Sequence, residues 1–456
     1  MTDSSHPPSS ALADTLLQGL AQRMRAPLVL ALSGGRDSIV MLHCLANLAR
    51  QYPFQWHAVH VHHGLSANAD AWAQFCVDAT RALGGECTVK HLDASHIKAL
   101  GKSVGIEDAA RQLRYAALGE VCRAVGSHTV LTAHHRDDQA ETVLLNLLRG
   151  SGLAGLSAMP MQADVTQHGF QLVRPWLDQP VALLAEYVTM HQLRHIEDES
   201  NFDTRFTRNK IRHEIMPILA EHFAGYDLLL VRAARHAAQA QRLLDELAHS
   251  DLQAVCAGDG SASRTMLTAL SEDRLTNLLR YWLSSMQVRT PSEARLTQWI
   301  HQIRTAHDNA HIQLPHEDGA LRSYRDRLYW VTDMPVCESI LQIDTILFNA
   351  QGVARIALPQ WGGFLQMQID PRLTQDLAIG WQVRPRSGGE RFKAHPKRPS
   401  KILKQWYEEA AIPLWQRHGP MLWFGEQLVW VAHLGLDCRS PEGLLAIEWH
   451  TTGKPV

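Results

Sequence analysis

The sequence predicts an α/β fold for the N-terminal part of the chain, a doubly wound and mostly parallel sheet. A helical middle domain and a small α+β C-terminal domain are expected to follow. Short apolar runs alternate with amphipathic stretches over residues 28–149, and a glycine pair directly follows the first run. Helical periodicity then dominates residues 211–305. Because the chain has 456 residues, two or three domains are expected, and we place them at 1–217, 218–350 and 351–456.

The expected strands are apolar runs bounded by turn residues, and each precedes a stretch with helical periodicity. Parallel sheets of this kind bind ligands at the carboxyl ends of their strands. Residues 150–180 are rich in Gly and Pro and are expected to be loop, before a helix at 180–193. Strand character returns at 327–331 and 353–358. The expected strands of the N-terminal part are 28–32, 56–62, 86–92 and 128–133, and its expected helices are 14–25, 38–50, 69–84, 107–125 and 137–149.

The composition is that of an ordinary globular protein, with 45% hydrophobic and 20% charged residues. The formal net charge is -2, so any basic surface for nucleic acid must be local. The seven cysteines include no C-x-x-C pair, which favours a reducing compartment and argues against a zinc ribbon or an iron–sulfur site. The sequence contains neither a signal-peptide pattern nor an apolar run of about 18 residues. We therefore expect a cytoplasmic protein without a membrane segment.

The most informative segment is a glycine loop between the first strand and its helix. Adjacent glycines let backbone N–H groups approach an anion closely, and the N-terminus of the following helix adds its positive dipole end. Asp37 is unfavourable beside phosphates unless a cation lies between them, which makes it a candidate Mg²⁺ ligand. A serine-capped tight turn is the alternative interpretation, and the lysine of an ordinary P-loop is absent. The candidate nucleotide-binding residues of this loop are Ser33, Gly34, Gly35, Arg36, Asp37 and Ser38.

Three histidines, His60, His62 and His63, lie within four residues at the end of the second expected strand. Alternate residues of a strand share one face, but no cysteine or carboxylate completes a metal-ligand set here. We therefore expect a wall of the nucleotide pocket rather than a metal site. His60 and His63 are its candidate nucleotide-binding residues.

Arg111 and Arg114 lie three residues apart at the start of the long helix expected at 107–125, so they share one helix face. A solvated face of glutamate and arginine is one interpretation. The other is a positive face that stabilises a triphosphate or the departing pyrophosphate.

Acidic residues open the helix expected after the fourth strand. Asp138 and Glu141, with His134 before them, lie at a strand's carboxyl end, where the ligand of the glycine loop should also lie. Acids are common at helix N-termini because they suit the dipole, but carboxylates at this edge can also share Mg²⁺ or orient an attacking amine. The candidate catalytic residues are therefore Asp37, Arg111, Arg114, His134, Asp138 and Glu141.

Two basic stretches are candidates for RNA contact. Residues 205–212 contain four basic side chains, and residues 384–404 contain eight against one acid. Lys and Arg give affinity for phosphates without reading sequence, and a solvated face is the alternative interpretation. The candidate RNA-binding residues are Arg205, Arg208, Asn209, Arg212, Arg391, Lys397, Arg398 and Lys401.

The S-G-G-x-D-S loop at 33–38 resembles that of the N-type ATP pyrophosphatases, or PP-loop superfamily, whose Rossmann-like domains cleave ATP between its α and β phosphates. Further segments at 60–66, 105–115, 132–153 and 198–212 resemble, in order and spacing, motifs of the tRNA-isoleucine lysidine synthetases. The resemblance covers residues 25–217 at high specificity. It returns in the end region between Arg384 and Trp415.

The resemblance implies a carbon–nitrogen ligase that uses ATP and Mg²⁺. ATP would adenylate the C2 oxygen of the wobble cytidine in a tRNA-Ile with a CAU anticodon, and L-lysine would displace AMP. This reaction changes codon and amino-acid specificity from Met to Ile. The implied partners are that tRNA and L-lysine, and a homodimer is compatible with them.

Two alternatives stay open. One is another adenylating enzyme, such as a tRNA thiolase or a glutamine-dependent synthetase, against which the absence of a C-x-x-C pair and of an N-terminal cysteine nucleophile domain argues. The other is a non-catalytic tRNA-binding protein, against which the presence of Asp37, Asp138 and Glu141 argues.

Overall fold

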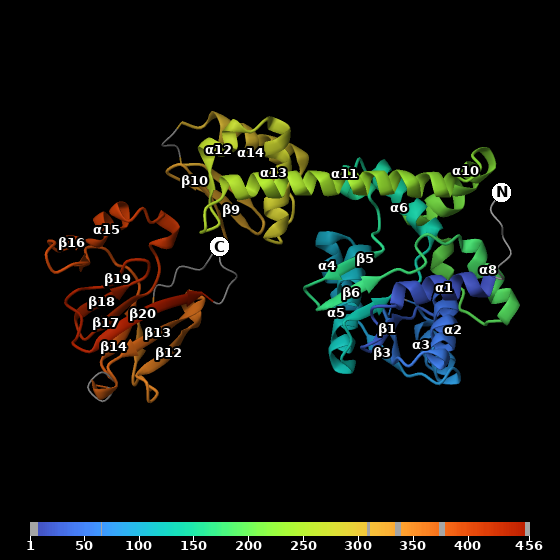
Figure 1. Cartoon of the computed structure of the whole chain (residues 1–456), viewed down its shortest axis with the longest axis horizontal. Coiled ribbons are helices and arrows are strands. Elements are labelled where there is room, and N and C mark those ends of the chain that lie inside the picture. Colours follow the sequence, from blue (N-terminus) through green and yellow to red (C-terminus); the bar gives the residue numbers. More distant parts are fainter. Residues whose placement is uncertain (1–7, 65, 308–310, 333–338, 374–378, 452–456) are drawn as a thin grey trace. The chain divides into compact units, whose positions relative to one another are not determined.

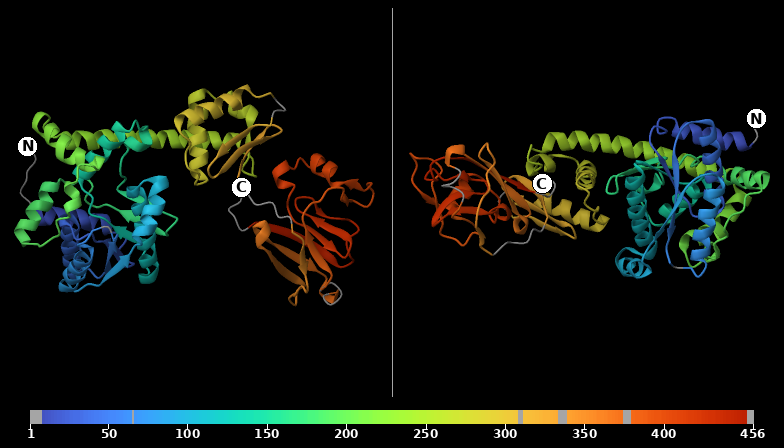
Figure 2. Two further views of the ribbon diagram at one scale, coloured as in Figure 1. Left: turned by 180° about the vertical axis from the view of Figure 1, so that it is seen from behind. Right: turned by 90° about the horizontal axis from the view of Figure 1, so that it is seen from below.

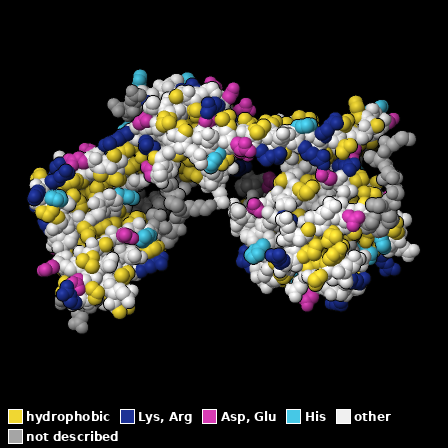
Figure 3. All heavy atoms as spheres, in the orientation of Figure 1, with side chains coloured by type: hydrophobic (Ala, Val, Ile, Leu, Met, Phe, Trp, Pro, Cys, Tyr) yellow, Lys and Arg dark blue, Asp and Glu magenta, His cyan; other side chains and the backbone are white. Residues whose placement is uncertain are grey.

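A computed structural model describes residues 8–64, 66–307, 311–332, 339–373 and 379–451 (Figure 1). The chain divides into two compact units, Met1–Leu243 and Leu244–Val456. Acidic and basic side chains are interspersed on the face seen in Figure 3, in keeping with the net charge of -2. Within the described ranges, no helix combines the length and the apolar character needed to cross a bilayer.

The first unit is built on a six-stranded sheet with the order β3-β2-β1-β4-β6-β5. Neighbouring strands are parallel except for β5 and β6, which form an antiparallel hairpin. The first strand is central because its apolar side chains are buried on both faces. The strands are β1 (Leu28–Ala31), β2 (Trp56–His62), β3 (Cys87–His91), β4 (Thr129–Leu131), β5 (Gln162–Val165) and β6 (Phe170–Val173).

Helices cover both faces of this sheet (Figure 2). Leu28 and Leu30 of β1 belong to the core formed with α1, α2 and α8, whereas Val29, which points the other way, packs with Leu118 and Val121 of α5. The expected doubly wound fold is therefore confirmed. The helices are α1 (Pro8–Leu20), α2 (Arg36–Gln51), α3 (Ala69–Ala82), α4 (Ala94–Val104), α5 (Ile106–Val125), α6 (Arg136–Leu148), α7 (Leu153–Leu156) and α8 (Val181–His191).

One expectation for this unit is wrong. Residues 150–180 are not all loop, because they contain α7 and the β5–β6 hairpin, whose turn uses Gly169 at a φ of +75°. The hairpin strands have four residues each, too few for an alternating pattern to stand out. In addition, α4 was not predicted; Gly105, at a φ of +90°, separates it from α5.

The segment after α8 contains a π-helix with a local cause. Pro217 has no N–H to donate to the carbonyl of residue 213, and its ring crowds that carbonyl. The N–H of Met216 accordingly bonds to the carbonyl of Ile211, five residues back. The segment comprises the 3₁₀ turn η1 (Glu199–Phe202), α9 (Thr207–Lys210), the π-helix η2 (Ile211–Ile215), α10 (Met216–His222) and the long helix α11 (Tyr226–Val255).

The second unit begins with helices packed on a four-stranded antiparallel sheet of order β7-β10-β9-β8. The helical prediction for this region and the strand character predicted after residue 305, including the strand at 327–331, are confirmed, whereas β7 lies within the stretch expected to be helical. These elements are β7 (Ala262–Ser263), α12 (Arg264–Ala269), α13 (Glu272–Ser285), α14 (Glu293–Thr305), β8 (Gln313–His316), β9 (Gly319–Tyr324) and β10 (Arg327–Val331).

The C-terminal part is rich in strands, with sheets β11-β14-β17-β18-β19 and β12-β13-β20 around buried Trp381 and Leu365. The expected α+β character is confirmed. Because the chain divides into two units, the domain boundaries at 217 and 350 stay predictions. The elements are β11 (Leu341–Ile343), β12 (Val353–Leu358), η3 (Pro359–Trp361), β13 (Gly363–Ile369), η4 (Pro371–Leu373), β14 (Trp381–Arg384), β15 (Arg391–Phe392), β16 (Lys401–Ile402), α15 (Leu403–Glu409), η5 (Leu414–Gln416), β17 (Met421–Phe424), β18 (Gln427–Val431), β19 (Gly435–Leu436) and β20 (Leu444–Thr451).

Candidate active site

The glycine loop is shaped by its two serines. The Ser38 hydroxyl accepts the N–H of Gly34 at 3.1 Å and donates to the Gly35 carbonyl at 2.9 Å, and it lies 3.0 Å from the Ser33 hydroxyl. Gly34 has a φ of +88°, in the left-handed region that favours glycine. Its carbonyl accepts the N–H of Ile196 at 2.9 Å, so the loop is also tied to the chain after α8. The result is a fixed turn that opens α2 at the carboxyl end of β1.

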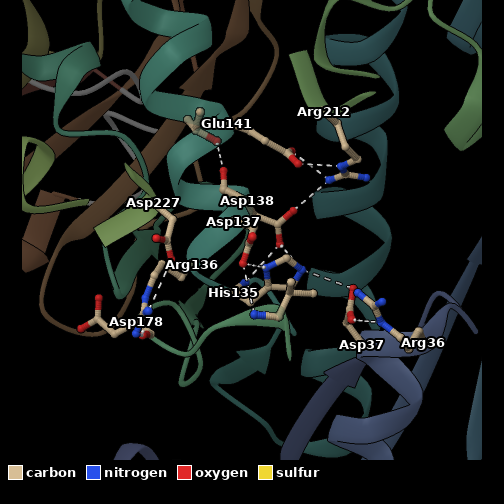
Figure 4. A network of polar contacts seen from close by, with 12 residues as sticks. Arg36, Asp37, His135, Arg136, Asp137, Asp138, Glu141, Asp178, Arg212 and Asp227 are labelled. Carbon is tan, nitrogen blue, oxygen red and sulfur yellow. Dashed lines mark hydrogen bonds and ion pairs between the residues drawn. The ribbon is translucent and has the colours of Figure 1, made fainter. Parts of the chain in front are cut away.

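A buried histidine joins this loop to the start of α6 (Figure 4). His135 is 5% exposed, and its Nε2 lies 3.5 Å from an oxygen of Asp37 and 3.5 Å from an oxygen of Asp138. Its Nδ1 lies 3.7 Å from Asp137. Three carboxylates from two strand ends therefore surround one imidazole.

The charged groups of this cluster stabilise one another's ionised forms. Burial lowers the pKa of His135, but the surrounding carboxylates of Asp137, Asp37 and Asp138 outweigh it and raise the pKa to about 10. His135 is therefore an imidazolium at neutral pH. Burial likewise raises the pKa of Asp37, yet the hydrogen bond and charge of His135, helped by Arg36, bring it below its usual range.

His135 was not among the site residues predicted from the sequence, whereas its neighbour His134 was. His134 Nδ1 lies 2.9 Å from the Thr132 hydroxyl, and burial lowers its pKa to about 4, although the charge of Asp138 opposes this. It is therefore a neutral ring at neutral pH. Only the position of His135 at the strand-to-helix corner could have drawn attention to it.

Asp138 and Glu141, both candidate catalytic residues, are bound by two arginines expected to contact RNA. Glu141, 2% exposed, accepts from Arg212 Nε at 2.6 Å and from Arg208 Nε at 3.0 Å. Arg212 also reaches Asp138 at 3.2 Å. Residues from α6, α9 and the π-helix thus form one compact charge network. Because Arg208 and Arg212 face carboxylates here, their contact with RNA stays a prediction.

These groups line a cavity of about 360 Å³, a size suited to a small ligand. Its walls carry both signs of charge, and its apolar side comes from α10 and the start of α11. A ligand with both an ammonium and a carboxylate group would find opposite charges for each. The cavity is lined by Arg36, Asp37, His135, Asp137, Glu141, Val181, Arg212, Met216, Pro217, Ala220 and Tyr226.

The expected arginine face lies at the end of β2. Arg114 contacts Nε2 of His63 at 3.1 Å, and Arg111 lies over the ring of Tyr115, 5.9 Å from its centroid. Burial and the charge of Arg114 lower the pKa of His63 to about 4, so this histidine is neutral. Both arginines stay exposed to solvent.

His60 turns away from solvent. It is buried, and its Nδ1 lies 2.9 Å from the carbonyl of Leu32 and 3.3 Å from the sulfur of Cys76. It therefore supports the end of β1 from below the glycine loop. Direct contact of His60 with a nucleotide stays a prediction.

The remaining RNA candidates lie on the surface. Arg205 pairs with Asp203 at 2.7 Å, and Asn209 donates to the Asp203 carbonyl at 3.0 Å. In the second unit, Lys401 pairs with Glu409, and Arg391 donates to the Ser400 carbonyl at 2.6 Å. Lys397 and Arg398 are exposed between β15 and β16.

The donor set fits a magnesium ion that is held partly by substrate. Within the part of the chain that the structure describes, no group of three or more His, Cys, Asp or Glu side chains is arranged to hold a metal by itself. Mg²⁺ usually takes one or two protein carboxylates and completes its shell with phosphate oxygens and water. Asp37, at the glycine loop and 31% exposed, fits the protein share of such a site.

A phosphate-type loop at the end of β1, facing carboxylates at the end of β4, defines a PP-loop nucleotide-binding domain. The family model described as "PP-loop domain" matches residues 8–219. Two further models, "TilS substrate binding domain" and "TilS substrate C-terminal domain", match residues 263–329 and 381–449.

Curated relatives place the chain more narrowly. The tRNA(Ile)-lysidine synthase of Burkholderia pseudomallei is 38% identical, and the match covers 93% of each chain. That of Nitrosomonas europaea is 32% identical over 99% of this chain and 98% of its own. The chain belongs to the tRNA(Ile)-lysidine synthase family, which confirms the resemblance. A solved tRNA thiolase from Methanococcus maripaludis is similar at a TM-score of 0.44 and 17% identity, with 50% of this chain and 79% of its own covered.

Proposed function

We propose that this chain ligates L-lysine to C2 of the wobble cytidine of a tRNA-Ile with a CAU anticodon, and that it consumes ATP and releases AMP and pyrophosphate. The product, lysidine, changes codon and amino-acid specificity from Met to Ile. The observation that carries this proposal is the union of a PP-loop with a cavity of mixed charge that opens between the ends of β1 and β4. A nucleotide-activating loop and an amino-acid-sized cavity thus share one edge of the sheet.

The ATP step uses the loop and its neighbours. The N-terminus of α2, which opens at the glycine loop, suits the phosphates. Mg²⁺, when bound by Asp37 and the phosphates, would neutralise charge on the leaving pyrophosphate. Arg111 and Arg114 would add positive charge as the cytidine C2 oxygen attacks the α-phosphorus and the bond to pyrophosphate breaks.

The second step is supported by the charge pattern of the cavity. In the cavity wall, Glu141 offers a carboxylate for an ammonium group and Arg212 offers a guanidinium for a carboxylate, and Arg208 and Asp138 are bound to these two side chains from behind the wall. The ε-amine of free lysine has an ordinary pKa near 10.4 and must lose a proton before it attacks C2. Asp138 or Glu141 would take that proton while the C2–O bond to AMP breaks.

The tRNA would be held by both units. The segment 205–212 lies beside the cavity, and the stretch 384–404 supplies a second basic surface. The three family-model segments support our division into a catalytic domain at 1–217, a substrate-specificity domain at 218–350 and a tRNA-binding domain at 351–456. A homodimer and a cytoplasmic location are part of this proposal.

A nucleophile-exchange assay tests the function. Pyrophosphate release is measured with tRNA and ATP, and the tRNA product is then analysed by mass spectrometry with lysine, ammonia or a sulfur donor present. Only lysine should add mass to a cytidine; a gain of sulfur or an amine from ammonia would contradict the proposal. Asp37→Ala should abolish pyrophosphate release and leave tRNA affinity within a few fold, whereas Asp78→Ala, on the exposed face of α3, should behave like the wild type.

A further inference from the structure

Two exposed aromatic side chains lie in the segment that leads into the candidate site. Phe202, at the end of η1, is 68% exposed, and Phe206, just before α9, is 50% exposed. Neither belongs to the nearby core cluster of Ala140, Ile211 and Met216. A large aromatic ring left in water forfeits the stabilisation that burial would give, so folding alone does not explain these positions.

The ring of Phe202 is already held in place. It stacks on the ring of His213, with centroids 5.6 Å apart and an angle of 22° between the planes. Nε2 of His213 lies 2.8 Å from the carbonyl of Asn201, which fixes the histidine relative to η1. The stacked pair therefore presents an ordered aromatic face whose orientation costs little entropy to a ligand.

This pair is continuous with the chemistry of the site. His213 follows Arg212, whose guanidinium binds Glu141 in the cavity wall. The same segment carries two exposed basic residues, Arg205, which pairs with Asp203, and Lys210, which pairs with Glu214, and both suit the phosphates of a nucleic-acid strand. Proteins bind unstacked bases by this combination of aromatic faces and basic side chains.

We propose that Phe202, backed by His213, stacks on a nucleobase next to the wobble cytidine in the anticodon loop. The inference rests on the proposed function, because a cytidine extruded into the cavity leaves its neighbours without their stacking partner. Phe202 supplies that partner and so offsets part of the cost of extrusion.

The test combines protein and RNA changes in the full-length chain. Phe202→Ala should weaken binding of the CAU tRNA by roughly 5- to 100-fold, the range that loss of one stacked base corresponds to. Phe202→Tyr should restore binding and Phe202→Leu should not, because leucine is apolar but has no planar face. Tyr52→Ala is the matched control, since Tyr52 is 38% exposed at the far end of α2.

The RNA arm identifies the stacked base. Two tRNAs are used, one with an abasic nucleotide on the 5′ side of the wobble cytidine and one with it on the 3′ side. With one of them, Phe202→Ala should cost no further affinity. Equal weakening of intact and both abasic tRNAs, or no weakening at all, would overturn the stacking role.

The proposed function and the stacking inference can be tested independently, because tRNA binding does not depend on turnover. If the wild type forms no lysidine, the proposed function is contradicted whatever Phe202 does. If the wild type forms lysidine and Phe202→Ala binds tRNA normally, only the stacking inference is lost. Thermal unfolding of each variant should give the wild-type midpoint, which would show that the substitution leaves the fold intact.

Discussion

Nε2 of His135 lies 3.5 Å from Oδ2 of Asp37, so a residue at the start of α6 holds the carboxylate of the glycine loop. The loop therefore does not set the charge of Asp37 by itself. Asp137 and Asp138, which follow β4, share the positive charge of His135 with Asp37.

Replacing His135 by Gln should lower the free energy of unfolding by up to about 3–5 kcal/mol, because three partly buried carboxylates lose their buried partner. The pKa of His135 is raised to about 10, so its contribution is complete below the ordinary value of 6.5 and is lost as the pH rises toward 10. The lowered pKa of Asp37 means that its ionised form stabilises the folded state at pH values above the ordinary 3.8. This stabilisation is lost as the pH falls through the lowered pKa.

Denaturant unfolding of wild type and variant should therefore differ most between about pH 4 and 6.5, and the difference should shrink on both sides. A difference that does not vary with pH would contradict the charge cluster. His62→Gln is the control, since the partner of His62, Asp70, is exposed.

Gly34→Ala should impair ATP binding and cost about 1–3 kcal/mol of stability, since an alanine at a φ of +88° is strained. Its Cβ would also come 2.3 Å from the Ile196 side chain. Gly35→Ala places its Cβ 3.5 Å from the nearest atom and should leave stability almost unchanged. Calorimetric unfolding compares the two, and equal losses would show that the left-handed turn is not what the loop requires.

Glu141→Gln should weaken lysine binding, because the cavity keeps both arginines and loses the carboxylate that neutralises them. The stability cost should fall between the ~1 kcal/mol of an exposed pair and the ~3–5 kcal/mol of a buried one. Steady-state kinetics should show a raised KM for lysine with pyrophosphate release from ATP and tRNA retained. An unchanged KM would place lysine elsewhere. Glu186→Gln on α8 is a control at a distance from the cavity lining.

Changing Lys397 and Arg398 together to Ala should weaken tRNA binding and reduce the log–log salt slope by about 1.8, from two phosphate contacts of ~0.9 each. Adding Lys401→Ala should change the slope less, because Lys401 already pairs with Glu409. Filter binding at several salt concentrations measures this. Arg81→Ala, on exposed α3, is the control. If the salt slope of tRNA binding stays the same while ATP affinity collapses, Lys397 and Arg398 contribute to folding and not to an RNA-binding surface.

The fold was predictable where the pattern is local and long enough. The buried run at β1 and the glycine pair after it identify the sheet and its ligand edge, and α5 shows its periodicity over 20 residues. The four-residue strands of the β5–β6 hairpin lie below that limit, so their stretch appeared to be loop.

The candidate site was predictable as residue types but not as partners. Asp37, Asp138 and Glu141 lie at strand ends, where topology alone brings them together. The pairing of Arg212 with Glu141 joins positions 71 residues apart, which no local pattern reveals. His135 was missed for the same reason, because its role depends on burial beside Asp37, which belongs to another loop.

The bond between Ile196 N–H and the Gly34 carbonyl connects the phosphate loop to the chain that runs on into residues 198–212. If Gly34 moves when a nucleotide binds, this bond would pass the movement on to Ile196. Nucleotide and RNA then share a coupling free energy, and by linkage its size is the same in both directions. Whatever factor ATP adds to the affinity for tRNA, tRNA must add to the affinity for ATP.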